Sequence, residues 1–265
     1  MTHHAGFLIK LEQDKRPHWE PLAKSLAACF SFAANNDRPS EIDPRAWCRQ
    51  EIQKRSDCAG HGSTCVTEAA FVNGTGQLIQ FSPHYSYREA QRIDGITGDN
   101  GATISGCLEA AKLGNCPLEL CPYPSSYASP ITDAMRTAAA AFQIGSFGMP
   151  KSYDEIVACL VSGMGVHWGL GWDFTGPSQF VLTDVRGNGP GHATALLGYS
   201  SRKDSSGRPY LWLANSGYPT PGWYEVSPDA VNKALAHRWT VAIAMSRLSH
   251  PEPEPIRYDP LGGGT

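Results

Sequence analysis

The chain has 265 residues, of which 41% are hydrophobic and 18% are charged, and its formal net charge is -3. A chain of this size and composition can bury one large core or two lobes that share a cleft. The small net charge and the absence of any run of Lys or Arg argue against nucleic acid and anionic membranes as partners.

Residues 1–40 are predicted to be an N-terminal extension, because they mix short apolar runs with charges and close on a turn-rich stretch at 35–40. The start of the chain lacks a basic stretch followed by a long apolar core. No apolar run approaches the length needed to span a bilayer. We therefore expect neither a signal peptide nor a transmembrane segment, and a cytoplasmic or virion-associated location.

Residues 41–139 are predicted to form a helical lobe. The glycine-rich run 58–64 is expected to be a turn that leads into a short buried helix from Cys65 to about residue 73. A second helix is predicted to open at Ser82-Pro83 and to run through Arg92, and a third covers residues 104–113 and ends at a glycine.

Residues 140–249 are predicted to form a β-rich lobe, because short apolar runs alternate with Gly, Pro, Asn and Ser. The predicted strands are residues 161–172, 180–185, 192–199, 210–214 and 239–245. The Pro- and Gly-rich tail, 250–265, is expected to pack as an extended strand or not at all. A helical half followed by a β-rich half predicts an α+β protein with its site between two lobes.

Three residues indicate the chemistry of that site: Cys65, His192 and Asn215, in this order along the chain. A thiol is a strong nucleophile only as the thiolate, which the positive end of a helix stabilises. An imidazole accepts the proton, and an amide holds the ring in one tautomer. The predicted roles are Cys65 as nucleophile, His192 as base and Asn215 as the orienting residue.

Two residues compete for these roles. His167 is an alternative base, although it lies within a predicted core strand. Asp184 could orient a histidine, but an Asp before a Gly-Asn-Gly-Pro loop is more often a turn residue. We prefer His192 and Asn215.

The chain contains 8 cysteines, and seven remain if Cys65 is the nucleophile, so at least one other thiol is unpaired. A zinc site formed by Cys116 and Cys121 with Cys107 or Cys58 is a less favoured alternative, because the paired two-residue spacings of zinc ribbons are absent. Disulfides or buried thiols are favoured instead. No nucleotide-binding motif is present, and we predict neither a cofactor nor a metal.

Five motifs, in the same order along the chain, resemble those of the papain-like cysteine peptidases, and most closely their prokaryotic and phage-type branch. They lie at residues 62–66, 81–87, 101–123, 191–199 and 210–226. The resemblance covers roughly residues 43–230. It implies a two-lobe fold, with a helical first lobe, a β-barrel-like second lobe and the active site in the cleft between them.

The sequence departs from this family at two points. The resemblance implies a Gln six residues before the nucleophile, as a donor to the oxyanion, but Ala59 stands there. His61 and Ser63 are the candidate replacements, and His61 is the better placed because glycines flank it. The indole that shields the Asn–His pair is absent, and Tyr218 is the candidate to replace it.

The sequence therefore predicts a cysteine hydrolase that cleaves peptide bonds through a thioester acyl-enzyme, with a peptide or protein as its substrate. The alternative is a papain-like fold that works as a binding or assembly component, for example in a phage virion or at a bacterial surface, with weak or no turnover. A third possibility keeps the thiol chemistry for transglutamination or for hydrolysis of a non-peptide amide.

Overall fold

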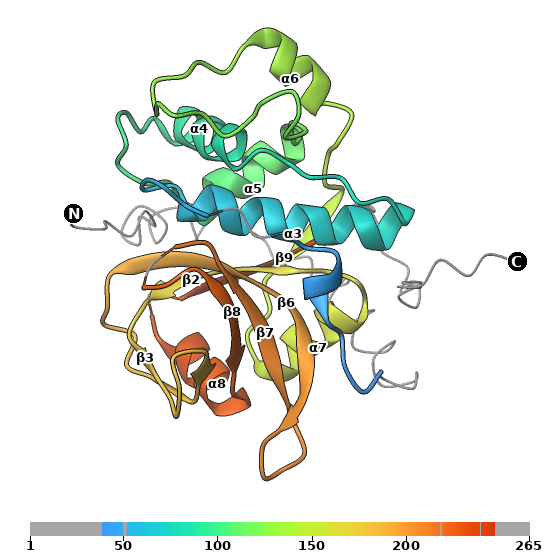
Figure 1. The fold of residues 1–265 in the computed structure, drawn as a ribbon, viewed down its shortest axis with the longest axis vertical. Helices are drawn as coiled ribbons and strands as arrows, with labels where there is room; N and C mark the ends of the chain where they lie inside the picture. Colours follow the sequence, from blue (N-terminus) through green and yellow to red (C-terminus); the bar gives the residue numbers. More distant parts are fainter. Residues whose placement is uncertain (1–38, 50–51, 218, 239, 247–265) are drawn as a thin grey trace, which may run out of the picture.

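The computed structural model describes residues 39–49, 52–217, 219–238 and 240–246. Nearly all of the predicted N-terminal extension, the tail at 250–265 and Tyr218 lie outside the described residues. Figure 1 shows the long helix α3 (Cys58–Thr75) lying across the molecule, with three other helices of the first half, α4, α5 and α6, on one side and the sheet on the other.

The first half of the described chain is helical, as predicted. Its further helices are η2 (Pro44–Ala46), α4 (Pro83–Asp94), α5 (Ile104–Leu113) and α6 (Asp133–Ala139). The hydroxyl of Ser82 caps α4 by accepting a hydrogen bond from the Tyr85 N–H at 3.1 Å, and Thr103 caps α5 in the same way through Gly106 at 2.8 Å. These caps are the local signals from which α4 and α5 could be predicted.

The start of α3 contradicts the sequence prediction. The glycine-rich run is helical, α3 begins at Cys58, and Cys65 lies in its third turn rather than its first. A Cβ added to Gly60 would lie 2.5 Å from the Pro83 carbonyl oxygen, and one added to Gly62 would lie 2.8 Å from the His167 ring. The glycines therefore allow close packing on both sides of the helix and do not form a turn.

The second half forms one sheet of seven strands in the order β1-β9-β2-β6-β7-β8-β4. All neighbours are antiparallel except the parallel pair of β4 and β8. The strands are β1 (Ser146–Gly148), β2 (Val166–Gly171), β4 (Val181–Leu182), β6 (Gly191–Lys203), β7 (Pro209–Asn215), β8 (Gly222–Val226) and β9 (Val241–Ser246), and β3 (Phe174–Thr175) pairs separately with β5 (Asp184–Val185). The predicted α+β class is confirmed.

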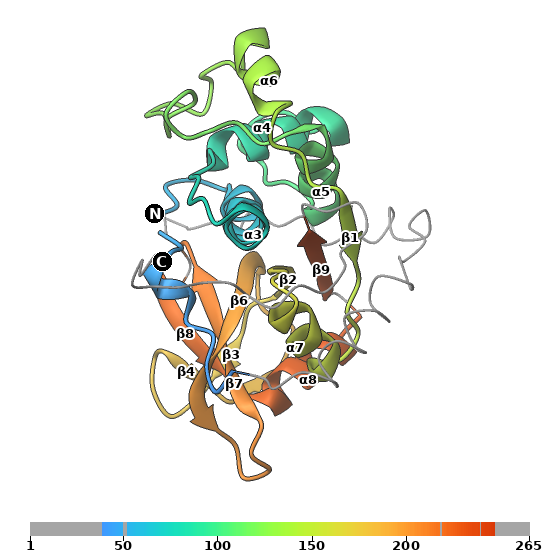
Figure 2. The ribbon, with the colours of Figure 1, turned by 90° about the vertical axis from the view of Figure 1, so that its right-hand side faces the viewer.

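The sequence predicted neither η2 and α6 in the first half nor the two helices in the second half. These two are α7 (Tyr153–Val161) and α8 (Pro228–Ala236). Both lie with the sheet, on the far side from α4 and α5 (Figure 2). Because α7 occupies the residues before Met164, the strand predicted at 161–172 begins only at Val166. Side chains from α7, α8 and the sheet form one buried cluster, and a second cluster joins α3 to the other face of the sheet.

The segment before α3 lies against the sheet. Ile42 and Tyr199 exchange backbone hydrogen bonds of 2.8 and 3.0 Å, which tie this segment to β6. The Asp43 carboxylate caps η2 by accepting from the Arg45 N–H. Within the described ranges, none of the helices is both long and apolar enough to cross a membrane.

Candidate active site

The clearest pair of the candidate site is His192 at the start of β6 and Asn215 at the end of β7. The His192 Nε2 and the Asn215 Oδ1 are 2.7 Å apart, and both side chains are fully buried. The predicted hydrogen bond between these two residues is confirmed.

A second hydrogen bond fixes the orientation of the Asn215 amide. The Asn215 Nδ2 donates to the Thr220 carbonyl oxygen at 2.8 Å, so the Oδ1 faces the imidazole. This network assigns the ring hydrogen to Nε2 of His192, because a carbonyl oxygen only accepts. The Nδ1 is then the basic nitrogen of the neutral ring.

The surroundings of His192 keep it neutral. Burial lowers its pKa to about 4, against the hydrogen bond with Asn215, and the nearby charge of His61 lowers it further. The Trp172 ring packs edge-on against the imidazole, with centroids 5.2 Å apart. Trp172 therefore shields the His192–Asn215 pair from water, the role for which the sequence had suggested Tyr218.

The first turn of α3 holds a cysteine that the sequence interpretation did not assign to catalysis. Cys58 is the first residue of the helix and is fully buried. Its sulfur is placed at the positive end of the helix dipole, whose effect falls off within the first turn. Cys65, seven residues further on, lies beyond that turn.

The packing of α3 on the sheet indicates which cysteine is nearer to His192. Gly62 lies against the Thr194 carbonyl oxygen, and further along Val66 lies against Gly165. Gly165 in turn contacts Leu197. The residue numbers of α3 and of β6 therefore increase toward the same end of their contact.

His192 precedes Thr194 by two residues, or about 7 Å of strand. Cys58 precedes Gly62 by about 6 Å of helix, whereas Cys65 lies about 4.5 Å beyond it. Cys58 therefore lies on the same side of the Gly62–Thr194 contact as His192, whereas Cys65 lies on the opposite side. The register favours Cys58.

The thiol of Cys65 has a different neighbour. It makes a hydrogen bond with the Cys48 thiol, and this contact, with burial, raises the pKa of Cys48 well above its usual value. Both side chains belong to the core cluster between α3 and the sheet. This environment is typical of structural thiols.

Gln53 lies beside the strand end that carries Asn215. Its backbone N–H donates to the Ser216 carbonyl oxygen at 2.8 Å, and its side-chain Oε1 accepts from the Ser216 hydroxyl at 3.2 Å. Gly217 makes room for it, since a Cβ there would lie 2.5 Å from the Gln53 Oε1. Gln53 precedes Cys58 by five residues, a spacing hidden from sequence reasoning that was anchored on Cys65.

The two oxyanion candidates from the sequence both lie within α3. The His61 Nε2 is 3.6 Å from the Asp57 Oδ1, and its ring centroid is 5.4 Å from that of Tyr123. The ring thus extends toward the start of the helix and away from Cys65. Ser63 is fully buried, and it lies about 140° around the helix from Cys58.

A buried charged cluster surrounds Asp57, the N-cap of α3. The Tyr123 hydroxyl donates to its Oδ2 at 2.5 Å, and the Arg55 Nε lies 3.8 Å from the same oxygen. Burial raises the pKa of Asp57 to about 6, although Tyr123 and Arg55 oppose this shift. The carboxylate next to Cys58 therefore changes charge close to neutral pH.

The structure separates the remaining alternatives from the pair. His167 is fully buried on β2 beneath Gly62, and burial lowers its pKa to about 3. Asp184 is exposed and pairs with Lys233 at 2.6 Å. Cys116 and Cys121 contact each other, but no cluster of three or more potential metal ligands occurs in the part of the chain that the structure describes.

Comparison with solved structures places this arrangement in a known fold. The chain is similar to xylellain, a cysteine protease from Xylella fastidiosa, with a TM-score of 0.63 and 16% identity over 87% of this chain and 91% of that chain. The chain has the papain-like fold.

Two further structures agree with the papain-like fold. The ragweed pollen cysteine protease Amb a 11, in its proform, has a TM-score of 0.66 and 16% identity over 98% of this chain and 77% of that chain. Procathepsin L 3 from the Tenebrio molitor larval midgut gives 0.61 and 14% over 80% and 71%. No protein-family model and no curated protein matches the sequence. Identities this low show the fold alone.

Proposed function

We propose that this chain is a papain-like cysteine hydrolase that cleaves peptide bonds through a thioester acyl-enzyme. The observation that carries the proposal is the buried His192–Asn215 hydrogen bond of 2.7 Å, which lies toward the N-terminal end of α3. A buried, neutral imidazole with a fixed tautomer suits a general base beside a thiol.

In this proposal the nucleophile is Cys58, and the sequence-based assignment of Cys65 is the competing hypothesis. Three observations support Cys58: its place at the helix start, its side of the Gly62–Thr194 contact, and the engagement of Cys65 with Cys48. A thiolate at Cys58 gains from the helix dipole, and from the imidazolium that forms when His192 takes the thiol proton.

In the proposed reaction His192 accepts a proton and then gives it up again in each of the two steps, acylation of the thiol and hydrolysis of the thioester. The Cys58 sulfur attacks the peptide carbonyl carbon while the Nδ1 of His192 accepts the thiol proton. That proton then passes to the leaving amine, and a thioester remains on the sulfur. Water attacks the thioester, again with the imidazole as base, and releases the acid and the thiol.

The developing oxyanion needs a donor besides backbone N–H groups, and Gln53 is our candidate. Its amide carries two N–H bonds, of which one donates to the Arg55 carbonyl oxygen at 2.7 Å. His61, proposed from the sequence, is the alternative donor in the same first turn. Ser63 is disfavoured by its place on another side of the helix.

The test compares three proteins on a set of fluorogenic peptides: the wild type, Cys58→Ser and Cys65→Ser. We expect Cys58→Ser to lower kcat/KM by at least about a thousandfold, because no nucleophile remains, whereas Cys65→Ser retains activity. The reverse pattern would restore Cys65 as the nucleophile. An inactive but folded wild type that also resists thiol-directed inhibitors would favour the binding or assembly function.

A further inference from the structure

One carboxylate holds the loop at 186–190, which leads directly into β6 and His192. The Asp173 Oδ1 accepts hydrogen bonds from the N–H groups of Arg186 and Gly187 at 2.9 and 2.6 Å. Its Oδ2 accepts from the Asn188 N–H at 3.0 Å. Three successive backbone donors on one carboxylate make charge-assisted bonds that fix the shape of the loop. The bonds use only the backbone of these three residues, so a change of the Asn188 side chain leaves them intact.

The same loop packs on the backbone that precedes Asp173. The Trp172 N–H donates to the Pro190 carbonyl oxygen at 2.9 Å. A Cβ added to Gly189 would lie 1.8 Å from the Trp172 carbonyl oxygen, so only glycine allows this close approach. The loop therefore has one fixed position against the end of β2.

His192 is the second residue of β6 after this loop, and it pairs with Leu170 of β2. Trp172 follows β2 directly, and its ring packs edge-on against the imidazole, with centroids 5.2 Å apart. Asp173 is thus the next residue after the indole that covers His192, and it also binds the loop before His192. Loss of its hydrogen bonds would loosen the backbone next to both rings at once.

We propose that Asp173 is a positioning residue for His192, which acts through the loop at 186–190 to keep the imidazole in the place and orientation that proton transfer from the nucleophile requires. The inference rests on the proposed hydrolase function and adds a residue to it. Asp173 acts only through the backbone that it binds. A misplacement of the reacting groups by about 1 Å costs on the order of a hundredfold in rate, so such support has a measurable effect on catalysis.

Asp173→Asn tests the proposal with a side chain of almost unchanged size. The substitution leaves at least one of the three backbone donors facing an NH2 group instead of an acceptor. We expect kcat for a peptide substrate to fall about tenfold to a hundredfold and KM to change less than about threefold. Steady-state kinetics measures this split.

Proton NMR reports the position of the ring without any substrate. The buried ring N–H of His192, which lies on Asn215 at 2.7 Å, should give a slowly exchanging signal, assigned by its loss in His192→Ala. In Asp173→Asn we expect this proton to exchange with water at least about tenfold faster, because the ring is no longer held beneath Trp172. If the wild type does not hydrolyse peptides, this signal still shows whether Asp173 holds His192, so the two proposals fail separately.

Asp204→Asn is the matched control. The Asp204 Oδ1 also organises a turn through backbone donors, since it accepts from the N–H groups of Ser206 and Arg208, both at 2.9 Å. That turn lies beyond the far end of β6 from His192. Asp204→Asn should therefore keep the wild-type kcat and ring signal, whatever its effect on stability.

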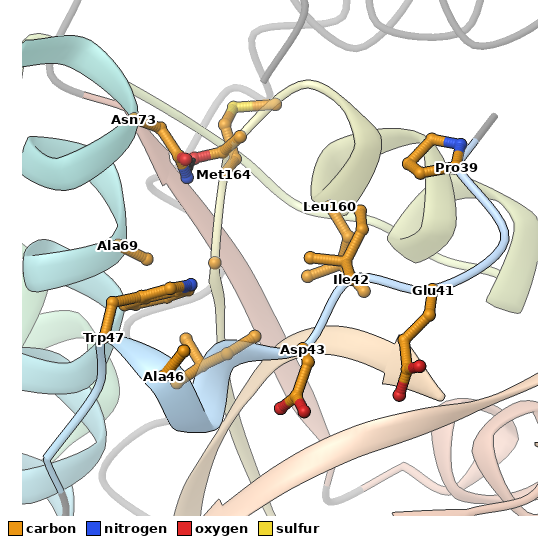
Figure 3. A pocket seen from close by; sticks show the side chains of 13 residues that line it. Pro39, Glu41, Ile42, Asp43, Ala46, Trp47, Ala69, Asn73, Leu160 and Met164 are labelled. Atoms are coloured by element: carbon orange, nitrogen blue, oxygen red, sulfur yellow. Dashed lines mark hydrogen bonds between the residues drawn. The ribbon is translucent and has the colours of Figure 1, made fainter. Parts of the chain in front are cut away.

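The cavity of about 390 Å³ between the segment 39–47 and the helices α3 and α7 offers a second control (Figure 3). Leu197 of β6 lines this cavity, and so does the exposed Ala46. Ala46→Leu changes the packing beside the same strand that carries His192 but does not touch the loop. It should also keep the wild-type kcat and ring signal.

Asp173→Glu is a second variant, which keeps the charge and lengthens the side chain by one methylene group. Its kcat and ring exchange should change in the same direction as those of Asp173→Asn, but less. Wild-type kcat and wild-type ring exchange in either folded variant would overturn the proposal. An equal fall of kcat in Asp173→Asn and Asp204→Asn would overturn it too, because the effect would then follow stability and not the position of His192.

Discussion

Asn215 is held on two sides, by the His192 ring and by the Thr220 carbonyl oxygen. This double contact allows one orientation of the amide and therefore one tautomer of the imidazole. Trp172 covers the same ring with its edge. The geometry at the residue scale is that of a base prepared before substrate arrives, with the Nδ1 as its basic nitrogen.

Replacing Asn215 with Ala should lower kcat roughly tenfold to a hundredfold and leave KM nearly unchanged, because the ring loses its orientation but the substrate contacts remain. Steady-state kinetics on a peptide substrate measures this split. Asn188→Ala, at an exposed loop position, is the matched control and should behave as the wild type. Equal kcat values in all three proteins would remove Asn215 from the mechanism.

At the scale of elements, the position at which α3 begins determines which cysteine is assigned as the nucleophile. The caps of α4 and α5 are local signals, so these helices were predicted correctly from sequence alone. The start of α3 was predicted wrongly, because glycines normally end helices. Here the glycines allow close contacts with α4 and with the sheet, and these partners are distant in sequence. That error moved the expected helix start from Cys58 to Cys65, and with it hid Gln53 five residues before Cys58.

Gly62→Ala tests this explanation. The added Cβ would lie 2.8 Å from the His167 ring and 3.0 Å from the Thr194 carbonyl oxygen, so we expect a loss of about 1–3 kcal/mol in the free energy of unfolding. Gly74→Ala, at an exposed position of the same helix, should be neutral or slightly stabilising. Chemical denaturation compares the two, and equal effects would refute the close-packing role.

At the scale of the whole molecule, the helical half and the sheet meet through an apolar cluster, and buried ionisable groups lie beside it. His192 and His167 have pKa values lowered to about 4 and about 3 by burial, whereas the pKa of Asp57 is raised to about 6. The strand order of the sheet could not be predicted from local patterns, because it depends on tertiary contacts. The helices α7 and α8 do carry local signals, since Ser152 and Ser227 cap them as Ser82 caps α4, and these signals were missed when the sequence was interpreted. The His192–Asn215 pair could be predicted, because both residues sit in distinctive strand motifs.

These pKa values predict opposite pH dependences of stability. The unfolded chain binds protons at a histidine near pH 6.5 and folded His167 does not, so the free energy of unfolding falls as the pH drops below about 6.5. His167→Leu should remove about 2–3 kcal/mol of the loss between pH 6.5 and 4.5. Asp57 has the opposite sign, because its folded form holds a proton more tightly, so its contribution is lost as the pH rises from about 4 to 6.

Urea unfolding of the wild type, His167→Leu and Asp57→Asn between pH 4 and 7 measures these contributions. The profile of His167→Leu should be flatter than that of the wild type on the acid side. The profile of Asp57→Asn should fall more steeply on acidification, since the opposing contribution of the carboxyl is gone. Parallel profiles for all three proteins would contradict the burial of both groups.

The proposed role of Cys58 is tested most directly by mapping the residue that a peptidyl vinyl sulfone labels at neutral pH. The probe alkylates an activated thiolate, and mass spectrometry of the digested protein identifies the modified cysteine. We expect the label on Cys58, with loss of labelling in His192→Ala and retention in Cys65→Ser. A label on Cys65 in the folded wild type, or labelling of Cys58 that is unchanged in His192→Ala, would contradict the proposed site.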